Sequence, residues 1–205
     1  MTITDYVIAV AVFLFLGVYV SWRAGRLDRM HTRLEAARAA LDVTLVRRSS
    51  VALELASSGF LDPATSLLLA GAAHEARDSV QATDGERAPS GLAVTGLGDI
   101  ELAQSNLSRA LRAAFAQPGF RVWLDSQEGA ADLMAELEAA AHQVLVARKF
   151  YNSAVAVTRD ARRKPLVRLL RLAGHADLPD FFEMDDSLVV EDDDGAGADM
   201  QRLAG

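Results

Sequence analysis

The side chains that could do chemistry in this 205-residue chain include four histidines and many carboxylates, but no cysteine. The missing cysteine excludes disulfides, thiolate-held zinc, iron–sulfur clusters and a cysteine nucleophile. Carboxylate-bridged metal sites in helical bundles use Glu-x-x-His pairs, and none of the histidines here follows a Glu by three residues. Glu138 and His142, like His31 and Glu35, lie four residues apart, which favours ordinary solvated pairs on a helix surface. We therefore expect no metal, no cofactor and no catalytic residue.

Other motifs in the sequence are incomplete. Gly96-Leu-Gly98 lacks the preceding strand and the Lys-Ser/Thr of a phosphate-binding loop. His74-Glu75 lacks the second histidine of a zinc-protease helix, and no serine stands in a Gly-x-Ser-x-Gly elbow. The acidic run at 191–194 lacks the alternate spacing of a calcium loop.

A basic cluster is the most prominent chemical feature. Between Arg148 and Arg171 there are eight Lys or Arg residues and a single acid, Asp160. The cluster could be a solvated helix end, a contact for anionic lipid or nucleic acid, or a surface onto which the acidic tail folds. The lack of interleaved aromatic residues disfavours nucleic acid. The candidate interaction patch consists of Arg159, Arg162, Arg163, Lys164, Arg168 and Arg171.

The net charge of −7 is unevenly distributed along the chain. Residues 177–205 contain ten acids and one base, a charge of −9, so residues 1–176 carry +2. Because periodicity is also lost there, we expect 177–205 to be an acidic, disordered tail, apart from Phe181-Phe182, which could dock on the rest of the protein.

Residues 6–22 form an uncharged, strongly apolar run between Asp5 and Arg23. Its 17 residues would span about 25 Å as a helix, close to the thickness of a bilayer core, with Tyr6, Tyr19 and Trp22 at its ends. This favours a membrane anchor in residues 1–22 over a buried helix or a cleaved signal peptide. Arginines at 23, 26, 29 and 33 place the C-terminal domain in the cytoplasm by the positive-inside rule, so we expect a single-pass protein of the cell (inner) membrane.

The elements after the anchor are expected to be helices only. An apolar seam with heptad spacing continues from Leu27 to Leu55, which predicts one long helix to about Ser57 and a break at Gly59. Asp62-Pro63 predicts the start of a second helix to about Gln81, with its apolar stripe on Leu61, Ala64, Leu68, Gly71 and Glu75. A loop is expected over 83–98.

The second half of the chain predicts three more helices. Asp99 is expected to cap a third helix that ends at 117–119, and Asp125 with Glu128 to form a capping box for a long fourth helix. Pro165 should kink or end that helix, and a short last helix is expected over 166–173. The fold class is therefore all-α: an N-terminal transmembrane helix, an antiparallel bundle of long helices over 23–176, and the tail.

The fourth helix contains the stretch Ala147-Arg-Lys-Phe-Tyr-Asn-Ser-Ala-Val155. With Arg148, Tyr151, Asn152 and Val155 it matches the motif Ala-Arg-x-x-Tyr-Asn-x-x-Val, and in this the sequence resembles the LemA family. Weaker similarities are found at 41–48, 73–75, 123–127 and 181–183, and the likeness covers about residues 24–183. The chain departs from the family at Thr158-Arg159, Lys164-Pro165 and 51–53, which makes it a divergent member.

The resemblance implies a membrane helix followed by an antiparallel bundle, and no established catalytic activity. We expect Tyr151 and Asn152 to serve in interhelical packing and hydrogen bonding. The leading hypothesis is a membrane-anchored docking or assembly module with an unknown protein partner. Anionic lipid is a possible second partner, and homo-oligomers are permitted. The alternative is a membrane-anchored enzyme or regulator with a metal site in the bundle.

Overall fold

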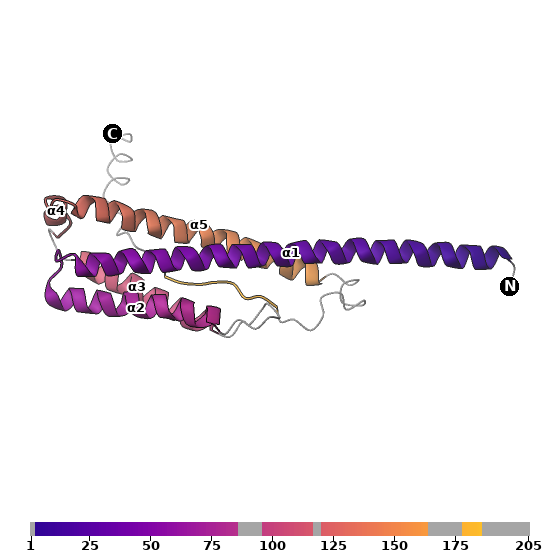
Figure 1. The fold of residues 1–205 in the computed structure, drawn as a ribbon, viewed down its shortest axis with the longest axis horizontal. Helices are drawn as coiled ribbons and strands as arrows, with labels where there is room; N and C mark the ends of the chain where they lie inside the picture. Colours follow the sequence, from indigo (N-terminus) through magenta and orange to yellow (C-terminus); the bar gives the residue numbers. More distant parts are fainter. Residues whose placement is uncertain (1–2, 86–95, 117–119, 164–177, 186–205) are drawn as a thin grey trace, which may run out of the picture.

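The computed structural model describes residues 3–85, 96–116, 120–163 and 178–185, and every regular element among them is helical. The elements are α1 (Ile3–Ser57), α2 (Pro63–Gly85), α3 (Leu97–Phe115), α4 (Phe120–Asp125) and α5 (Ala130–Arg163), followed by an extended segment, 178–185 (Figure 1). The prediction of an all-α bundle is confirmed. The kink at Pro165 and the helix expected over 166–173 lie outside the described residues.

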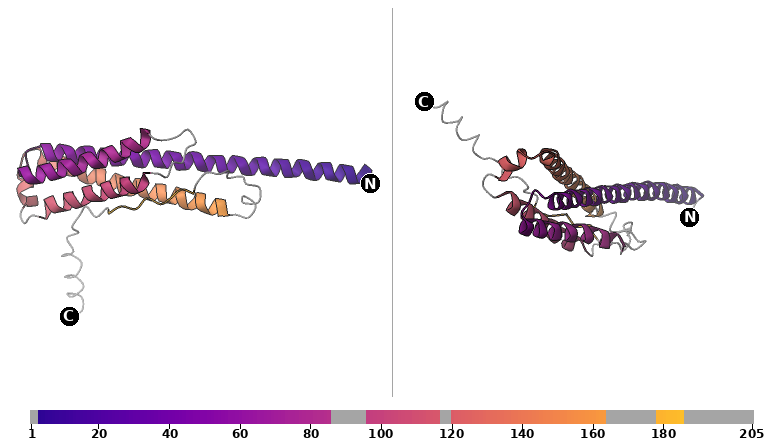
Figure 2. Two further views of the ribbon diagram at one scale, coloured as in Figure 1. Left: turned by 90° about the horizontal axis from the view of Figure 1, so that it is seen from below. Right: turned by 60° about the vertical axis from the view of Figure 1, so that its left-hand side comes forward.

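Helix α1 is continuous from the N-terminal region into the bundle, as its uninterrupted seam predicts (Figure 2). It ends at Ser57, and Gly59 then adopts φ 82°, a left-handed conformation that favours glycine. Asp62 starts α2, because its Oδ1 accepts the backbone N–H groups of Ala64 and Thr65, each at 3.1 Å. These hydrogen bonds stabilise the carboxylate and lower the pKa of Asp62.

The bundle contains two apolar clusters, one at each end. At the end far from the N-terminus, α1, α2, α3 and α5 all contribute, with Leu55, Leu69, Leu107 and Leu137 among the buried residues. In the other cluster α1 and α5 predominate, and the apolar side chains of the 178–185 segment complete it. Helix α1 lies beside both α2 and α5, whereas α2 lies between α1 and α3.

Three details of the predicted helices are wrong. The stripe expected on α2 faces outward within the helix, since Ala64, Leu68, Gly71 and Glu75 are exposed and only Leu61, which precedes the helix, is buried. Helix α2 buries Leu69, Ala73, Ala76 and Val80 instead. Three consecutive leucines left the face of α2 ambiguous, and packing against α1 and α3 decided it. Asp99 was expected to cap α3, but it lies within the first turn of that helix, and Gly96 occupies the N-cap position. Asp125 ends the short α4, and α5 begins after Gly129, whose φ is 81°.

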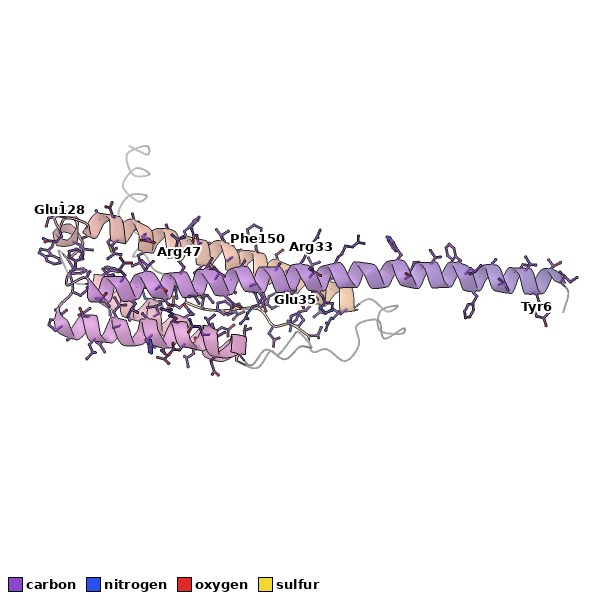
Figure 3. All side chains as sticks on the ribbon, viewed as in Figure 1. Tyr6, Arg33, Glu35, Arg47, Glu128 and Phe150 are labelled. Carbon is purple, nitrogen blue, oxygen red and sulfur yellow. The ribbon has the colours of Figure 1, made fainter. Side chains whose placement is uncertain are left out.

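The N-terminal part of α1 extends alone beyond the bundle in every view (Figures 2 and 3). Most of its described apolar side chains, such as Tyr6, Phe13 and Trp22, are exposed, Tyr19 is partly buried, and the buried residues of α1 begin at Leu34. Considering only what the structure describes, no helix is both long enough and apolar enough to cross a membrane. Within the run 6–22, the side chains of Ala9, Leu16 and Val20 lie outside the described set.

Candidate functional site

The candidate site is the surface of α3 and α5 that holds the extended segment 178–185, called here the strap. The strap runs along the bundle in the opposite direction to α5: Asp180 lies beside Arg159 and Tyr151, whereas Met184 lies beside Arg148. We call the residues that bind it the strap site, and these are Glu101, Ser105, Arg112, Arg148, Tyr151, Asn152 and Arg159.

Three family-motif residues of α5 bind the main chain of the strap. Asn152 makes a reciprocal pair with Phe182: its Nδ2 donates to the carbonyl oxygen at 3.0 Å, and its Oδ1 accepts the N–H at 2.8 Å. The hydroxyl of Tyr151 donates to the Asp180 carbonyl at 3.0 Å, and Nη1 of Arg148 donates to the Met184 carbonyl at 3.1 Å. Burial raises the pKa of Tyr151, which favours the protonated phenol that donates this bond.

Helix α3 binds the strap from the other side. The backbone N–H of Glu183 donates to Oε1 of Glu101 at 2.7 Å, and that of Asp185 donates to Oγ of Ser105 at 3.2 Å. Burial raises the pKa of Glu101, and the Glu183 N–H bond only partly offsets this effect. The strap therefore connects α3 to α5 through its own backbone.

From Phe181 to Met184 the side chains of the strap alternate: Phe182 and Met184 are buried, while Phe181 and Glu183 are exposed. Pro179, three residues before Phe182, is also buried. Phe182 is fully buried (0% exposed) in the cluster that includes Leu34, Leu41 and Val155. The strap thus adds apolar side chains to the core of the bundle. Phe181-Phe182 was expected to dock on the rest of the protein, and of the two it is Phe182 that is buried there. This part of the 177–205 tail differs from the expected disorder, and 186–205 lie outside the described residues.

Ion pairs lie at both ends of the strap. Arg159 contacts Oδ1 of Asp180 at 2.7 Å, and its guanidinium lies 5.1 Å from the centre of the Phe181 ring. Arg112 of α3 binds Asp185 through both terminal nitrogens, with Nη1 to Oδ1 at 2.9 Å. This bond raises the pKa of Arg112. Both ion pairs are partly exposed, so they contribute little to the affinity of the strap for the bundle. Their main effect is to favour acidic residues at positions 180 and 185.

A second polar cluster lies inside the bundle, centred on Arg48 of α1. Arg48 is 1% exposed, and its guanidinium donates to the backbone and side-chain oxygens of Gln104, at 2.9 and 2.7 Å, and to Oγ of Ser108 at 3.2 Å. Gln104 in turn donates to the Ala76 carbonyl at 3.0 Å. The cluster joins α1, α2 and α3, and its burial indicates a structural role.

The structure separates the residues of the predicted basic patch. Arg159 binds the strap, so the acidic tail does contact the patch at this point. Arg162 is buried, with its Nη2 3.4 Å from Nε2 of His31 on α1, and Arg163 is exposed at the end of α5. Lys164, Arg168 and Arg171 lie outside the described residues. Of the family-motif residues, Val155 is fully buried in the core.

The histidines do not form a metal site in the described part of the chain. His74 pairs with Asp78 on α2 at 3.1 Å, and His31 lies beside Arg162. Among the described residues, no group of three or more His, Asp or Glu side chains is placed to hold a metal ion.

The sequence interpretation missed the contribution of α3 to the strap site. Glu101, Ser105 and Arg112 occupy a polar side of α3 and carry no motif, so nothing in one sequence relates them to residues 73 to 82 positions away. Arg48 did carry a signal, because it occupies a position on the apolar seam of α1, where a charged residue must find buried partners.

Tyr151 packs between helices as expected, since it is buried in the cluster with Leu41 of α1 and the Arg38 guanidinium lies 5.8 Å from its ring centre. The hydrogen bonds of Tyr151 and Asn152, which were expected between helices, go to the strap instead. Comparison of the chain with protein-family models, curated proteins and solved structures finds no match. The LemA resemblance therefore remains a prediction from the quoted residues.

Proposed function

We propose that the protein is a docking module anchored in a membrane by the N-terminal part of α1, whose residues 6–22 cross the bilayer, with the bundle on the cytoplasmic side. The observation that carries the proposal is the isolated N-terminal part of α1, which exposes apolar side chains to solvent, and among the described side chains of α1 none before Leu34 is buried. Such a surface is costly in water and favourable in lipid. The sequence adds that residues 6–22 carry no charge.

The position of the basic residues supports this orientation. The contact between Arg162 and His31 sets the C-terminal end of α5 beside the part of α1 that follows the arginines at 23, 26 and 29. Both basic segments therefore lie at the end of the bundle that faces the proposed anchor, where anionic lipid headgroups would attract them.

The docking role is supported by the strap site. A surface of seven side chains holds an extended segment mainly by its backbone, a mode of binding that proteins use to recognise peptides. No enzyme chemistry is proposed.

The membrane part is tested by alkaline carbonate extraction of membranes from cells that express the full chain. We expect the full chain to stay in the membrane pellet and a chain without residues 1–22 to appear in the supernatant with its helical circular dichroism retained. Changing Leu67 and Leu68 to Asp is the control, since these exposed residues of α2 should not affect partitioning. Release of the full chain by carbonate would contradict the proposal.

Orientation is tested separately with Ser153→Cys, because Ser153 is exposed and the chain has no native cysteine. We expect a membrane-impermeant maleimide to label this variant only after the cells are lysed. Labelling in intact cells would place the bundle outside.

A further inference from the structure

The strap is bound in the way a peptide ligand is bound. Three of its carbonyl groups (residues 180, 182 and 184) and three of its N–H groups (residues 182, 183 and 185) meet side chains of α3 or α5. Contacts of this kind depend on an extended backbone and not on the side-chain sequence of the ligand. The strap site therefore has the donors and acceptors to bind any extended segment that also satisfies its apolar and charged contacts.

Those other contacts define a sequence pattern. Phe182 and Met184 insert two residues apart, which is the side-chain period of an extended chain. Acids at 180 and 185 meet Arg159 and Arg112, while the exposed Phe181 and Glu183 leave their positions less constrained. The ligand pattern is acid, any residue, aromatic, any residue, methionine, acid.

We propose that the strap site is a binding site for an extended acidic segment of another protein with this pattern, and that residues 178–185 occupy it in cis. The inference rests on the proposed docking function and identifies the chemistry of its partner. Charge complementarity at both ends selects an acidic partner, because the site places arginines at 112, 148 and 159 along the strap.

The covalent connection between α5 and the strap makes the site self-occupied. Residues 164–177 join them, and a linked ligand has an effective concentration of the order of millimolar. A free peptide of similar intrinsic affinity competes poorly against such a ligand at micromolar concentration. Weakening the strap should therefore open the site to a ligand in trans.

The test uses the full chain in detergent and a fluorescent peptide with the sequence of residues 178–185. We expect Phe182→Ala in the protein to lower the Kd for the unmodified peptide at least tenfold, because the variant strap loses its buried anchor. Leu178→Ala is the matched control within the strap, since Leu178 is half exposed, and it should bind the peptide like the wild type. Adding Asn152→Ala to Phe182→Ala should raise the Kd at least tenfold by removing the reciprocal pair.

Equal peptide affinity of the wild type and the Phe182→Ala variant, or binding that survives Asn152→Ala, would overturn the proposal. If Phe182→Ala loses helicity, a protease site inserted after residue 170 replaces it, and the full chain is cut after purification. The cut chain should then bind the peptide at least tenfold more tightly than the uncut chain, and equal affinities would refute the site.

Occupancy in cis is tested by oxidising a Ser105→Cys, Asp185→Cys variant, since Asp185 N and Ser105 Oγ are 3.2 Å apart and the protein has no other cysteine. A disulfide within one chain supports the proposal, whereas dominant cross-linked dimers would assign the strap to a second copy and overturn it. Carbonate extraction does not involve the strap, so failure of the peptide assay and failure of membrane anchoring are distinguishable.

Discussion

At the residue scale, neighbouring arginines of α1 have opposite environments. Arg48 is buried and hydrogen-bonded to Gln104 and Ser108, whereas Arg47 is about half exposed and pairs with Glu136 at 3.5 Å. A buried charged group that loses its partner costs several kcal/mol, whereas an exposed pair contributes about 1 kcal/mol or less. Arg48 therefore has a structural role, whereas Arg47 is a surface residue.

We expect Arg48→Ala to reduce the free energy of unfolding by about 3 kcal/mol, because it leaves Gln104 and Ser108 buried without their donor. Arg47→Ala, the matched control, should change it by less than about 1 kcal/mol. Urea denaturation followed by circular dichroism measures both. Similar losses for the two variants would contradict the assignment of Arg48 as the centre of the buried cluster.

Glu101 should make stability depend on pH. The pKa of Glu101 is raised in the folded protein, chiefly by burial, so folding favours the neutral carboxyl. The resulting contribution to the stability of the fold is complete below about pH 4.5 and is lost as the pH rises through the folded pKa. Glu101→Gln stays neutral, and its Oε1 can still accept the Glu183 N–H. We expect the melting temperatures of the two proteins to agree near pH 4 and the variant to be the more stable at pH 7. A constant difference across this range would count against the assignment.

At the element scale, two glycines have opposite roles. Gly59 adopts φ 82° between α1 and α2, while Gly71 is exposed within α2, and an added Cβ would meet nothing within 4 Å at either position. The backbone conformation alone then decides the effect of adding a methyl group.

Gly59→Ala should lower the free energy of unfolding by about 1 kcal/mol, because alanine is strained in the left-handed region. Gly71→Ala should raise it by about 0.5–1 kcal/mol, because alanine favours the helix. Chemical denaturation of the two variants beside the wild type measures these changes, and the same sign at both positions would refute the argument.

The elements were more predictable than their faces. The long helix α1, its end at Ser57 and the cap at Asp62 followed from local signals, namely an apolar period, a glycine and an Asp-Pro pair. The buried face of α2 did not, since leucines at 67, 68 and 69 allow more than one face and only contacts with α1 and α3 choose Leu69. The strap site likewise depends on residues far apart in the chain, although its α5 half coincides with the recognised motif.

At the scale of the whole molecule, the basic C-terminal end of α5 lies at one end of the long axis. The basic end of α5 lies beside α1 near His31, at the end of the bundle from which α1 continues alone. The exposed Arg163 lies at this end, and Arg109 is an exposed arginine on α3 that serves as its control.

We expect Arg163→Glu to weaken binding to vesicles that contain anionic lipid, measured by sedimentation at low salt with a chain that lacks residues 1–22. This deletion spares the core, whose buried residues in α1 begin at Leu34. Arg109→Glu makes the same charge change away from the proposed contact and should bind like the parent chain. Equal weakening by both variants would indicate a response to net charge alone.

The continuity of α1 has a mechanical consequence. If residues 6–22 cross the bilayer as proposed, the twelve residues that follow Trp22, up to Leu34, form an unbroken helical spacer of about 18 Å between lipid and core. The spacer would then fix the distance between the bundle and the lipid. Because the helix is continuous, a tilt or rotation of the membrane span would also tilt or rotate the bundle. Inserting residues into this spacer would change both the reach of the bundle and the direction in which the strap site faces.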